Sequence, residues 1–441
     1  MIEKVKTGLL IFLVALSLLQ SYFLAYKVPN FGLVTSSDSE YVNTELLGQQ
    51  KVIDDLIFPS QLIVHLGNDE HTIIYPKTQF YDLIVTQRLA NREFKSFQLV
   101  SQQTMSWEQI KREQRGIELN FADGISSDLM KRVLKIDTEG VIKASLINRV
   151  FIYSIEATEE VKAYFFDDQN KQVYESIDVD LTVKDMQDYV GFGQYLPRYD
   201  YIGESLYLAN EPIQALDLTY TYDVISPEQM QRNLFFDSVA TRAFVNRSGS
   251  QIYTDGKRGL QVEQNGLWIT FTNSAASQMN VSETSENVYA AVDFVNQHGG
   301  WDTSYQFVTY EEDNSLAEVI FRKYISHYPV IDISPFRYGQ MQLQMQQGVV
   351  MEYERTMIQL PLIADDKAIK WLYGGAILKQ HFATHPYRDD IVSIYPALRP
   401  HPKSKSVIVF EAIWAARLKD GTEMVFMEGI PAGIEPSQLM Q

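Results

Sequence analysis

The sequence predicts an α+β fold with antiparallel sheets, preceded by a single N-terminal transmembrane helix. Residues 8–26 read GLLIFLVALSLLQSYFLAY and carry no charge. After them, short β-type runs and helical runs follow one another without the regular strand–helix alternation that a parallel sheet requires. The dipeptide Asp255-Gly256 follows the strand-like run 252–254, and this chemistry favours a tight antiparallel hairpin. We therefore expect one membrane anchor and a large folded region built on antiparallel pairing.

The uncharged run has the length of a minimal membrane span. At ~1.5 Å per residue it just crosses a hydrocarbon core of ~30 Å. The alternative is a cleaved signal peptide, which has an apolar stretch of roughly 7–15 residues and a small-residue cleavage site. The run here is longer, lacks a good pair of small residues at its end, and has no cysteine for lipid attachment. These features favour an uncleaved anchor.

The charges beside this run indicate its orientation. Lys4 and Lys6 precede it within residues 1–7, whereas only Lys27 follows it closely. Positive charge favours the cytoplasmic side, so residues 1–7 are expected in the cytoplasm. The protein is then a single-pass protein of the cell membrane with its bulk in the extracytoplasmic space.

Composition excludes several functional classes. The 441 residues carry a net charge of −18, which disfavours nucleic acid as a partner because the phosphates would be repelled. No cysteine is present, so a disulfide framework and thiol chemistry are absent. An apolar content of 45% is ample for packed cores.

Local patterns predict the main elements. Strand-like runs are expected at 61–66, 72–75, 117–121, 150–155, 161–166, 216–222, 260–262, 267–271 and 340–345. Helical runs are expected at 80–92, 104–115, 227–235 and 366–380. The first two strands flank Asn68-Asp69 and form a hairpin. Ser226 and Pro227 offer an N-cap and a first helical residue for the helix at 227–235.

A weak internal similarity suggests a division of the folded region. The pattern Tyr207-x4-Pro212 recurs 117 residues later as Tyr324-x4-Pro329, and each copy leads towards a strand and then a helix. Such a match can also arise by chance, so duplication is a hypothesis. It predicts a linker at 27–36, an N-terminal domain at 37–195, a central domain at 196–322, and a C-terminal domain at 323–435 that resembles the central one.

Sequence motifs do not indicate catalysis. The phosphate-binding, dinucleotide-binding and serine-hydrolase motifs are absent from the sequence. His381 and His385 have the i, i+4 spacing of two metal ligands on a helix, but Phe382 occupies the position that supplies the general-base Glu in zinc proteases. Surface or packed histidines are the alternative that we favour. We expect no catalytic residue, no cofactor and no metal.

Small residues form one stripe on the predicted membrane helix. Ser17, Ser21 and Ala25 stand four residues apart, and Gln20 lies beside them. Small residues let two helices approach closely in lipid, and a glutamine can hydrogen-bond across the contact. The stripe is therefore a candidate helix-interaction site; the alternative is a plain anchor whose small residues face lipid.

Several segments in their order and spacing resemble the YycH family, also called WalH, of Gram-positive bacteria. They are YKVPN at 26–30, FPSQLIVH at 58–65, GIELNF at 116–121, LFFD at 234–237, YTDG at 253–256, FVNQHGGW at 294–301 and FRKY at 321–324. Together they span most of the chain.

The resemblance implies a regulatory function. Members of the family are membrane-anchored extracytoplasmic accessory proteins of the YycG/YycF (WalK/WalR) two-component system, which controls cell-wall metabolism. They act on the sensor histidine kinase YycG (WalK) together with the sister protein YycI, in part through membrane helices. The family also implies that YycI resembles the last two domains, and it offers no enzymatic residues. The alternative from sequence is a cell-envelope enzyme or wall-binding protein on the same anchor.

Overall fold

Strand pairing dominates the folded region, which we describe from a computed structural model of the chain. The structure describes residues 47–101, 105–137, 142, 146–238, 241–245, 250–274, 284–313 and 316–431, together with residues 6, 14, 16 and 17. The predicted membrane helix 8–26 lies largely outside these residues, and so do Gln20, Ser21 and Ala25 of the candidate stripe. Ser17 alone of the stripe is described. Within the described part of the chain, no helix combines the length and apolarity needed to cross a bilayer.

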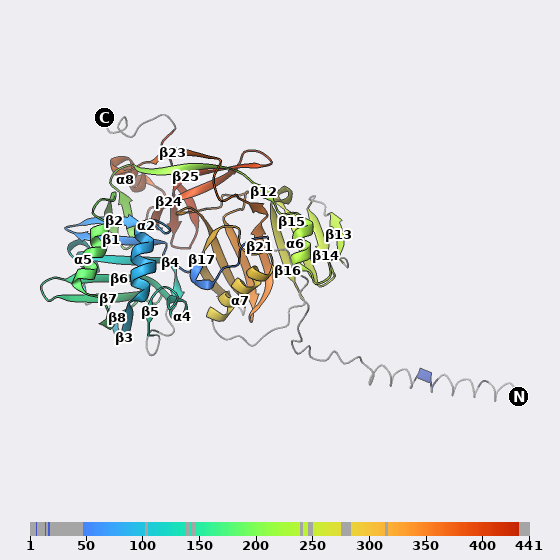
Figure 1. The fold of residues 1–441 in the computed structure, drawn as a ribbon, viewed down its shortest axis with the longest axis horizontal. Coiled ribbons are helices and arrows are strands. Elements are labelled where there is room, and N and C mark those ends of the chain that lie inside the picture. The colour runs from blue at the N-terminus through green and yellow to red at the C-terminus, as the bar shows by residue number, and fades with distance from the viewer. Residues whose placement is uncertain are drawn as a thin grey trace. The chain divides into compact units, whose positions relative to one another are not determined.

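The first half of the chain builds a ten-stranded sheet (Figure 1). Its order is β10 (Leu206–Ala209), β9 (Arg198–Gly203), β2 (Glu70–Ile74), β1 (Gln61–Gly67), β4 (Arg115–Ser126), β6 (Leu146–Ile155), β7 (Glu160–Asp167), β8 (Gln172–Val179), β3 (Glu93–Val100) and β5 (Lys135–Ile136). All neighbours pair antiparallel except β3 and β5, which are parallel. The predicted hairpin at Asn68-Asp69 is confirmed, with both residues at positive φ.

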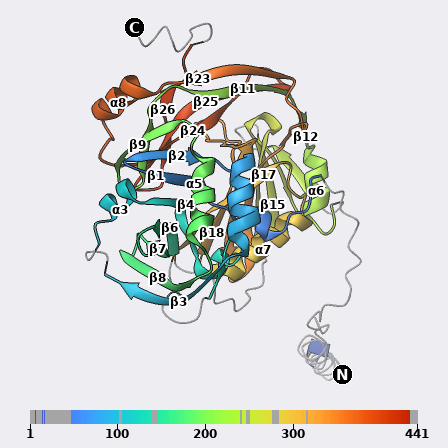
Figure 2. The same ribbon diagram turned by 60° about the vertical axis from the view of Figure 1, so that its left-hand side comes forward.

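The two faces of this sheet differ in character. One face is apolar, with Leu62, Val64 and Leu119 in a buried core that also contains residues of the covering helices. Those helices are α5 (Val183–Phe192) and the helical segment made of α2 (Gln79–Tyr81), η2 (Asp82–Arg88) and η3 (Leu89–Asn91). Figure 2 shows α5 in front of this sheet. The other face carries polar residues and is partly covered by α3 (Trp107–Glu113), which contacts β1.

A nine-stranded antiparallel sheet follows along the chain. Its order is β13 (Arg242–Val245), β14 (Gln251–Thr254), β15 (Arg258–Glu263), β16 (Trp268–Asn273), β21 (Val349–Thr356), β20 (Gln340–Gln346), β18 (Leu316–Ile325) and β17 (Ser304–Asp313), with β19 (Tyr328–Pro329) on β18. Helix α7 (Thr284–Gln297) packs against β18, β20 and β21. The expected Asp255-Gly256 hairpin is confirmed between β14 and β15, with Gly256 at φ 91°.

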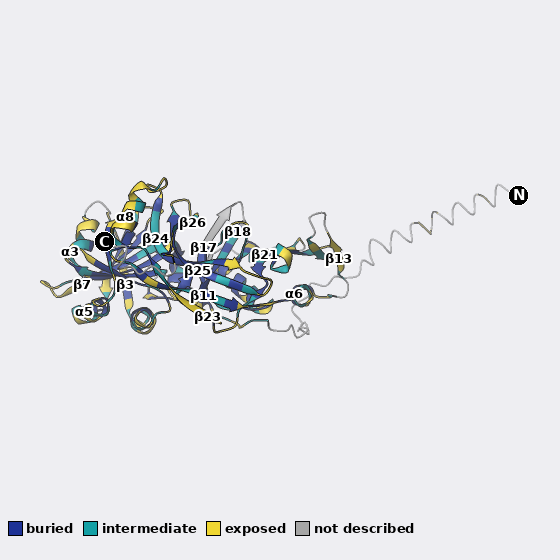
Figure 3. Ribbon diagram, turned by 90° about the horizontal axis from the view of Figure 1, so that it is seen from above, coloured by how far each residue is buried: buried dark blue, intermediate teal, exposed yellow. Residues whose placement is uncertain are grey.

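A five-stranded sheet completes the fold. It contains β23 (Asp366–Leu372), β11 (Ile213–Thr221), β25 (Val407–Leu418) and β24 (Ile391–Pro402) in that order, with β26 (Glu423–Glu428) on β25. Helix α8 (Gly375–Thr384) contacts β10. In Figure 3 the interior strand β25 is mostly buried, whereas exposed residues gather on helices such as α8 and at the edge strand β13.

The remaining short elements connect these layers. They are η1 (Ile53–Asp55), α4 (Ser127–Met130), α6 (Pro227–Leu234), η5 (Gln264–Gly266) and the strand pair β12 (Asp223–Val224) and β22 (Ile358–Gln359). The predicted cap of α6 is confirmed. Gln229 N donates to Ser226 Oγ at 3.2 Å, and Ser226 N donates to Gln229 Oε1 at 2.9 Å. This capping box satisfies two backbone donors at the helix start.

The prediction of a helix at 366–380 is wrong for the first half of this segment. Residues Asp366–Leu372 form the edge strand β23 and pair antiparallel with β11. Helix α8 begins only at Gly375, after Gly374, where a Cβ would lie 2.1 Å from Glu211 O. The Lys-Ala-Ile-Lys composition favours a helix locally, but pairing with β11 satisfies the same backbone groups within a larger sheet.

The two later sheets do not follow the expected domain boundaries. Strand β11, from the expected central domain 196–322, pairs with β23 and β25 from the expected C-terminal domain 323–435. Conversely, β20 and β21 of the later segment join β18 and β16 of the earlier one. Each sheet therefore takes strands from both segments. The duplication of the two segments stays a prediction.

Gly116 is expected to be sensitive to substitution because β4 and β6 approach closely there. A Cβ at this position would lie 2.5 Å from Ile152 O and 2.8 Å from Tyr153 Cβ. We predict that Gly116→Ala lowers the free energy of unfolding by about 1–3 kcal/mol, the typical cost of overpacking. Urea unfolding measures this change.

Gly191 provides the matched control, since it lies in α5 and a Cβ there would have no neighbour within 4 Å. Gly191→Ala should leave stability unchanged or raise it by up to ~1 kcal/mol, because alanine favours helix. Equal effects of the two substitutions would contradict the packing argument.

Candidate functional site

A row of four side chains crosses the polar face of the ten-stranded sheet. Gln61 of β1 stands opposite Asn120 of β4, Asn120 opposite Arg149 of β6, and Arg149 opposite Phe166 of β7. Successive residues along a strand point to opposite faces of the sheet. The residues that precede and follow these four along their own strands therefore lie on the apolar face. The strand register therefore places two amides, a guanidinium and an aromatic ring side by side.

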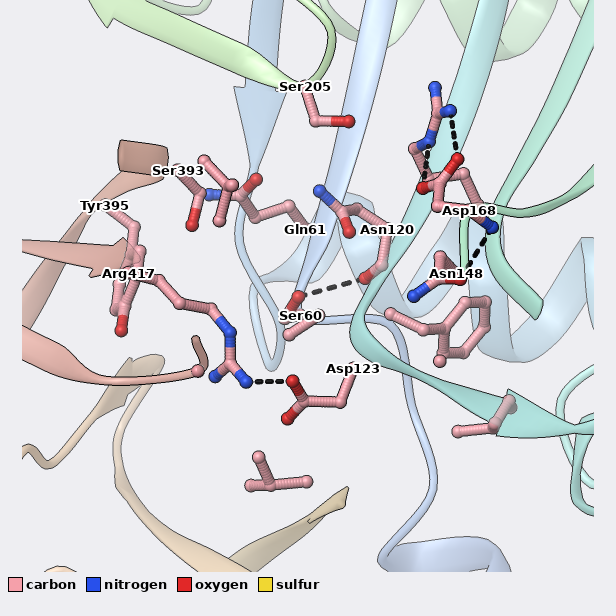
Figure 4. A pocket seen from close by; sticks show the side chains of 18 of the residues that line it. Ser60, Gln61, Asn120, Asp123, Asn148, Asp168, Ser205, Ser393, Tyr395 and Arg417 are labelled. Carbon is pink, nitrogen blue, oxygen red and sulfur yellow. Dashed lines mark hydrogen bonds and ion pairs between the residues drawn. The ribbon is translucent and has the colours of Figure 1, made fainter. Parts of the chain in front are cut away.

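This row forms one wall of a cleft of about 840 Å³. The nine-stranded sheet contributes Arg322 and Tyr324 to the lining, and the five-stranded sheet contributes Ser393, Tyr395 and Arg417. Figure 4 shows Gln61 and Asn120 of the ten-stranded sheet across from Ser393, Tyr395 and Arg417 of the five-stranded sheet. All three large sheets thus meet at one cavity, whose volume lies within the range of small-molecule sites.

A fully buried carboxylate lies beside the row. Glu118 Oε1 accepts from Lys111 Nζ at 3.1 Å, the same Nζ lies 2.9 Å from Oε2, and Arg149 Nη1 lies 3.5 Å away. Lys111 also donates to the Glu204 carbonyl oxygen at 2.9 Å, and Arg149 donates twice to Asp168, at 2.9 and 2.6 Å. Burial alone would raise the pKa of Glu118, but Lys111 and the other neighbouring donors hold it well below its ordinary value. The carboxylate is therefore ionised and paired with two cations.

Two buried histidines extend this network. His65 Nδ1 lies 3.1 Å from His71 Nδ1, and His65 Nε2 lies 3.4 Å from Glu118 Oε2. When His65 accepts from His71 at Nδ1, its own proton is on Nε2 and points towards Glu118. Burial lowers the pKa of His65, although Glu118 opposes the shift. Burial and the neighbouring His65 lower the pKa of His71 to about 4, so both rings are neutral at pH 7.

A second ionic network closes the opposite wall of the cleft. Glu423 Oε1 accepts from Arg322 Nη1 at 2.6 Å, from the Tyr395 hydroxyl at 2.5 Å and from Arg417 Nη1 at 3.4 Å. Arg417 also pairs with Asp123, which projects from the irregular part of β4 (Figure 4). These contacts join β4 of the first sheet to β18 of the second and to β24, β25 and β26 of the third.

The histidine pair singled out in the sequence lies elsewhere, at the end of α8. His381 Nε2 is 2.8 Å from the Phe426 carbonyl oxygen, and its ring centroid is 5.6 Å from that of His385. Among the described residues, no group of three or more metal-ligating side chains is assembled. The structure therefore engages His381 with the backbone and does not bring a third ligand to the pair.

Sequence reasoning missed the buried polar network. The signal was present, since Glu118 and Asn120 alternate with apolar residues in the run 117–121. Such alternation ordinarily indicates a strand with one solvent-exposed face. Here both faces are covered, and the polar residues lie inside.

Comparison with known proteins identifies related sequences along nearly the whole chain. Residues 3–189 match the family described as YycH protein, N-terminal domain, and residues 203–422 match YycH protein, C-terminal domain. The chain is 20% identical over 459 residues to "Two-component system WalR/WalK regulatory protein YycH" of Bacillus subtilis (strain 168), covering 98% of this chain and 99% of that protein. The crystal structure of YycH from Bacillus subtilis has the same fold, with a TM-score of 0.68 and 17% identity over 87% of this chain and 99% of that chain.

Replacement of Glu118 should be strongly destabilising. In Glu118→Gln, the buried Lys111 cation loses its carboxylate partner, and breaking a buried pair in this way typically costs about 3–5 kcal/mol. Chemical unfolding of the variant measures the loss. The control is Glu156→Gln, because Glu156 pairs with Arg115 while both side chains are more than half exposed. That change should cost less than about 1 kcal/mol, and a similar cost for both variants would be inconsistent with a buried network.

Acidification should destabilise the fold through His71. Its pKa is about 4 in the folded chain against 6.5 for the ordinary group, so the unfolded chain binds more protons between these values. Stability must then fall as pH is lowered from 6.5 towards 4, by at most about 1.4 kcal/mol per pH unit for this group. Urea unfolding across this range should give a shallower pH dependence for His71→Gln than for the parent chain. Parallel curves would show that His71 does not contribute.

Proposed function

Because this chain belongs to the YycH family, we propose that it is a membrane-anchored extracytoplasmic regulator of the sensor histidine kinase YycG (WalK). The observation that carries the proposal is the match to both family domains and, over 98% of the chain, to a protein named as a regulator of the WalR/WalK system. The sister protein YycI is the proposed partner in this regulation, and cell-wall metabolism is the process controlled.

The arrangement of charged groups supports a role in interaction. The carboxylates of Glu118 and Glu423 are each neutralised by two or more donors. Groups held in this way stabilise a structure and are poorly placed to exchange protons with a substrate. This is the pattern expected of a regulatory protein that acts by contact.

The proposed anchor is the uncharged segment 8–26, with the folded region outside the cytoplasm. In lipid, helices gain little from hydrophobic burial against one another. Close backbone packing at Ser17, Ser21 and Ala25, with a hydrogen bond from Gln20, would supply the association with a kinase helix. Each polar contact of this kind contributes ~0.6–2 kcal/mol.

The helix contact can be tested by filling the small-residue stripe. Replacing Ser17 and Ser21 together by Leu keeps the segment apolar and inserted, but it prevents close approach of a second helix. We expect loss of kinase regulation and of cross-linking to the kinase membrane helix, with normal amounts of protein in the membrane. Site-directed cross-linking in cells and a reporter of the kinase pathway measure the two effects.

Leu19→Ile is the control, since helical spacing would put Leu19 on roughly the opposite face of the proposed helix and the change keeps its volume. It should leave both readouts near the parent level. If the double leucine variant cross-linked and regulated like the parent, the stripe would be a lipid-facing surface and recognition would lie in the folded region.

A further inference from the structure

Two amides in the cleft wall lack hydrogen-bond partners. Gln61 is 5% exposed and Asn120 is 9% exposed, and they stand directly opposite each other on β1 and β4. Within the described part of the chain, neither side chain has a protein partner, and both line the cleft. Figure 4 shows the two side chains next to each other at the centre of the cavity.

These amides are open to the cleft. Their nitrogen and oxygen atoms are not among the fully buried side-chain atoms that lack partners, so a ligand in the cleft can reach them. On the opposite wall, Asp123 Oδ2 and Arg322 Nε also lack partners, but both atoms are fully buried. A ligand would therefore meet the two amides and not these buried atoms.

The buried cations of the cleft favour an uncharged ligand, whereas the two remaining lysines of the lining, Lys171 and Lys419, are exposed. Arg149 is paired with Asp168, Lys111 with Glu118, and Arg417 with Asp123. Arg322 is paired with Glu423. Because these cations already have carboxylate partners, an anionic ligand would have to displace an existing ion pair.

The shape of the wall favours recognition by side chains. Strands β1 and β4 are interior strands whose backbone groups pair with neighbours on both sides. An extended peptide therefore has no free strand edge here on which to add. The available groups are primary amides, which offer both donors and acceptors, and the half-buried ring of Trp107.

We infer that the cleft binds a small neutral carbohydrate. Sugar hydroxyls both donate and accept, so they can bind Gln61 and Asn120 together, while the apolar face of a sugar ring can lie against Trp107. A volume of 840 Å³ accommodates a ligand of about two or three sugar rings. The site is separate from the proposed membrane-helix contact, and its occupancy does not require the kinase.

The test is ligand-observed NMR with the full-length chain in a detergent that has no sugar headgroup. The probes are maltotriose and N,N′-diacetylchitobiose, with trialanine and sulfate as the peptide and anion comparisons. Saturation transfer to at least one sugar supports the inference. Transfer to neither sugar, or transfer only to trialanine or to sulfate, overturns it.

Variants of the amide pair identify the site. Gln61→Leu combined with Asn120→Leu should weaken sugar binding by at least about tenfold, because two neutral hydrogen bonds are lost. The same variant should keep a melting temperature close to that of the parent, since neither amide has a protein partner to lose. Undiminished sugar binding in this variant overturns the proposed site.

Two further variants serve as a control for unspecific effects and as a substitute if the double variant does not fold. Gln87→Leu, an exposed change in η2 on the far side of the sheet, should bind like the parent. If the double variant does not fold, Gln61→Met keeps the side-chain shape and should by itself weaken binding several-fold. If the Gln61→Met variant folds and binds the sugar with the affinity of the parent, the inference is overturned. If its melting temperature falls markedly while sugar binding is retained, the amide has a structural role and the inference is also overturned.

Discussion

The stability of the folded region depends on how it neutralises a charge that is buried on one face of the ten-stranded sheet. Glu118 lies at the centre of the ten-stranded sheet and is fully buried, so its charge must be compensated where it stands. Lys111 reaches it from α3, and Arg149 reaches it from the neighbouring strand β6. Because Lys111 also binds the Glu204 carbonyl between β9 and β10, one carboxylate fixes the position of a helix and of the sheet edge.

The same principle joins the three large sheets. Glu423 receives donors from β18, β24 and β25, and Arg417 connects this group to Asp123 on β4. A polar junction of this kind can hold sheets in register while leaving a cavity between them, whereas an apolar junction would close by side-chain packing. The cleft is thus a consequence of joining sheets through charged groups.

Much of the local structure could be predicted because it depends on neighbouring residues. The hairpin at Asp255-Gly256 follows from turn chemistry, and the start of α6 follows from the Ser226-Pro227 cap. The resemblance to the YycH family was also readable from short runs such as 58–65 and 116–121. The segment 366–372 could not be assigned correctly, because its strand conformation depends on pairing with β11, about 150 residues earlier.

The sequence by itself determined the antiparallel α+β class and the family. Tertiary structure alone decided that strands of the two expected later domains would share sheets, and that polar residues at alternate positions of β4 would be buried. It also placed Gln61 beside Asn120 and brought Arg322 and Arg417 to the other side of one cleft. The physical reason is that strand register and sheet packing join residues hundreds of positions apart, and periodicity within one segment carries no information about its neighbours across the sheet.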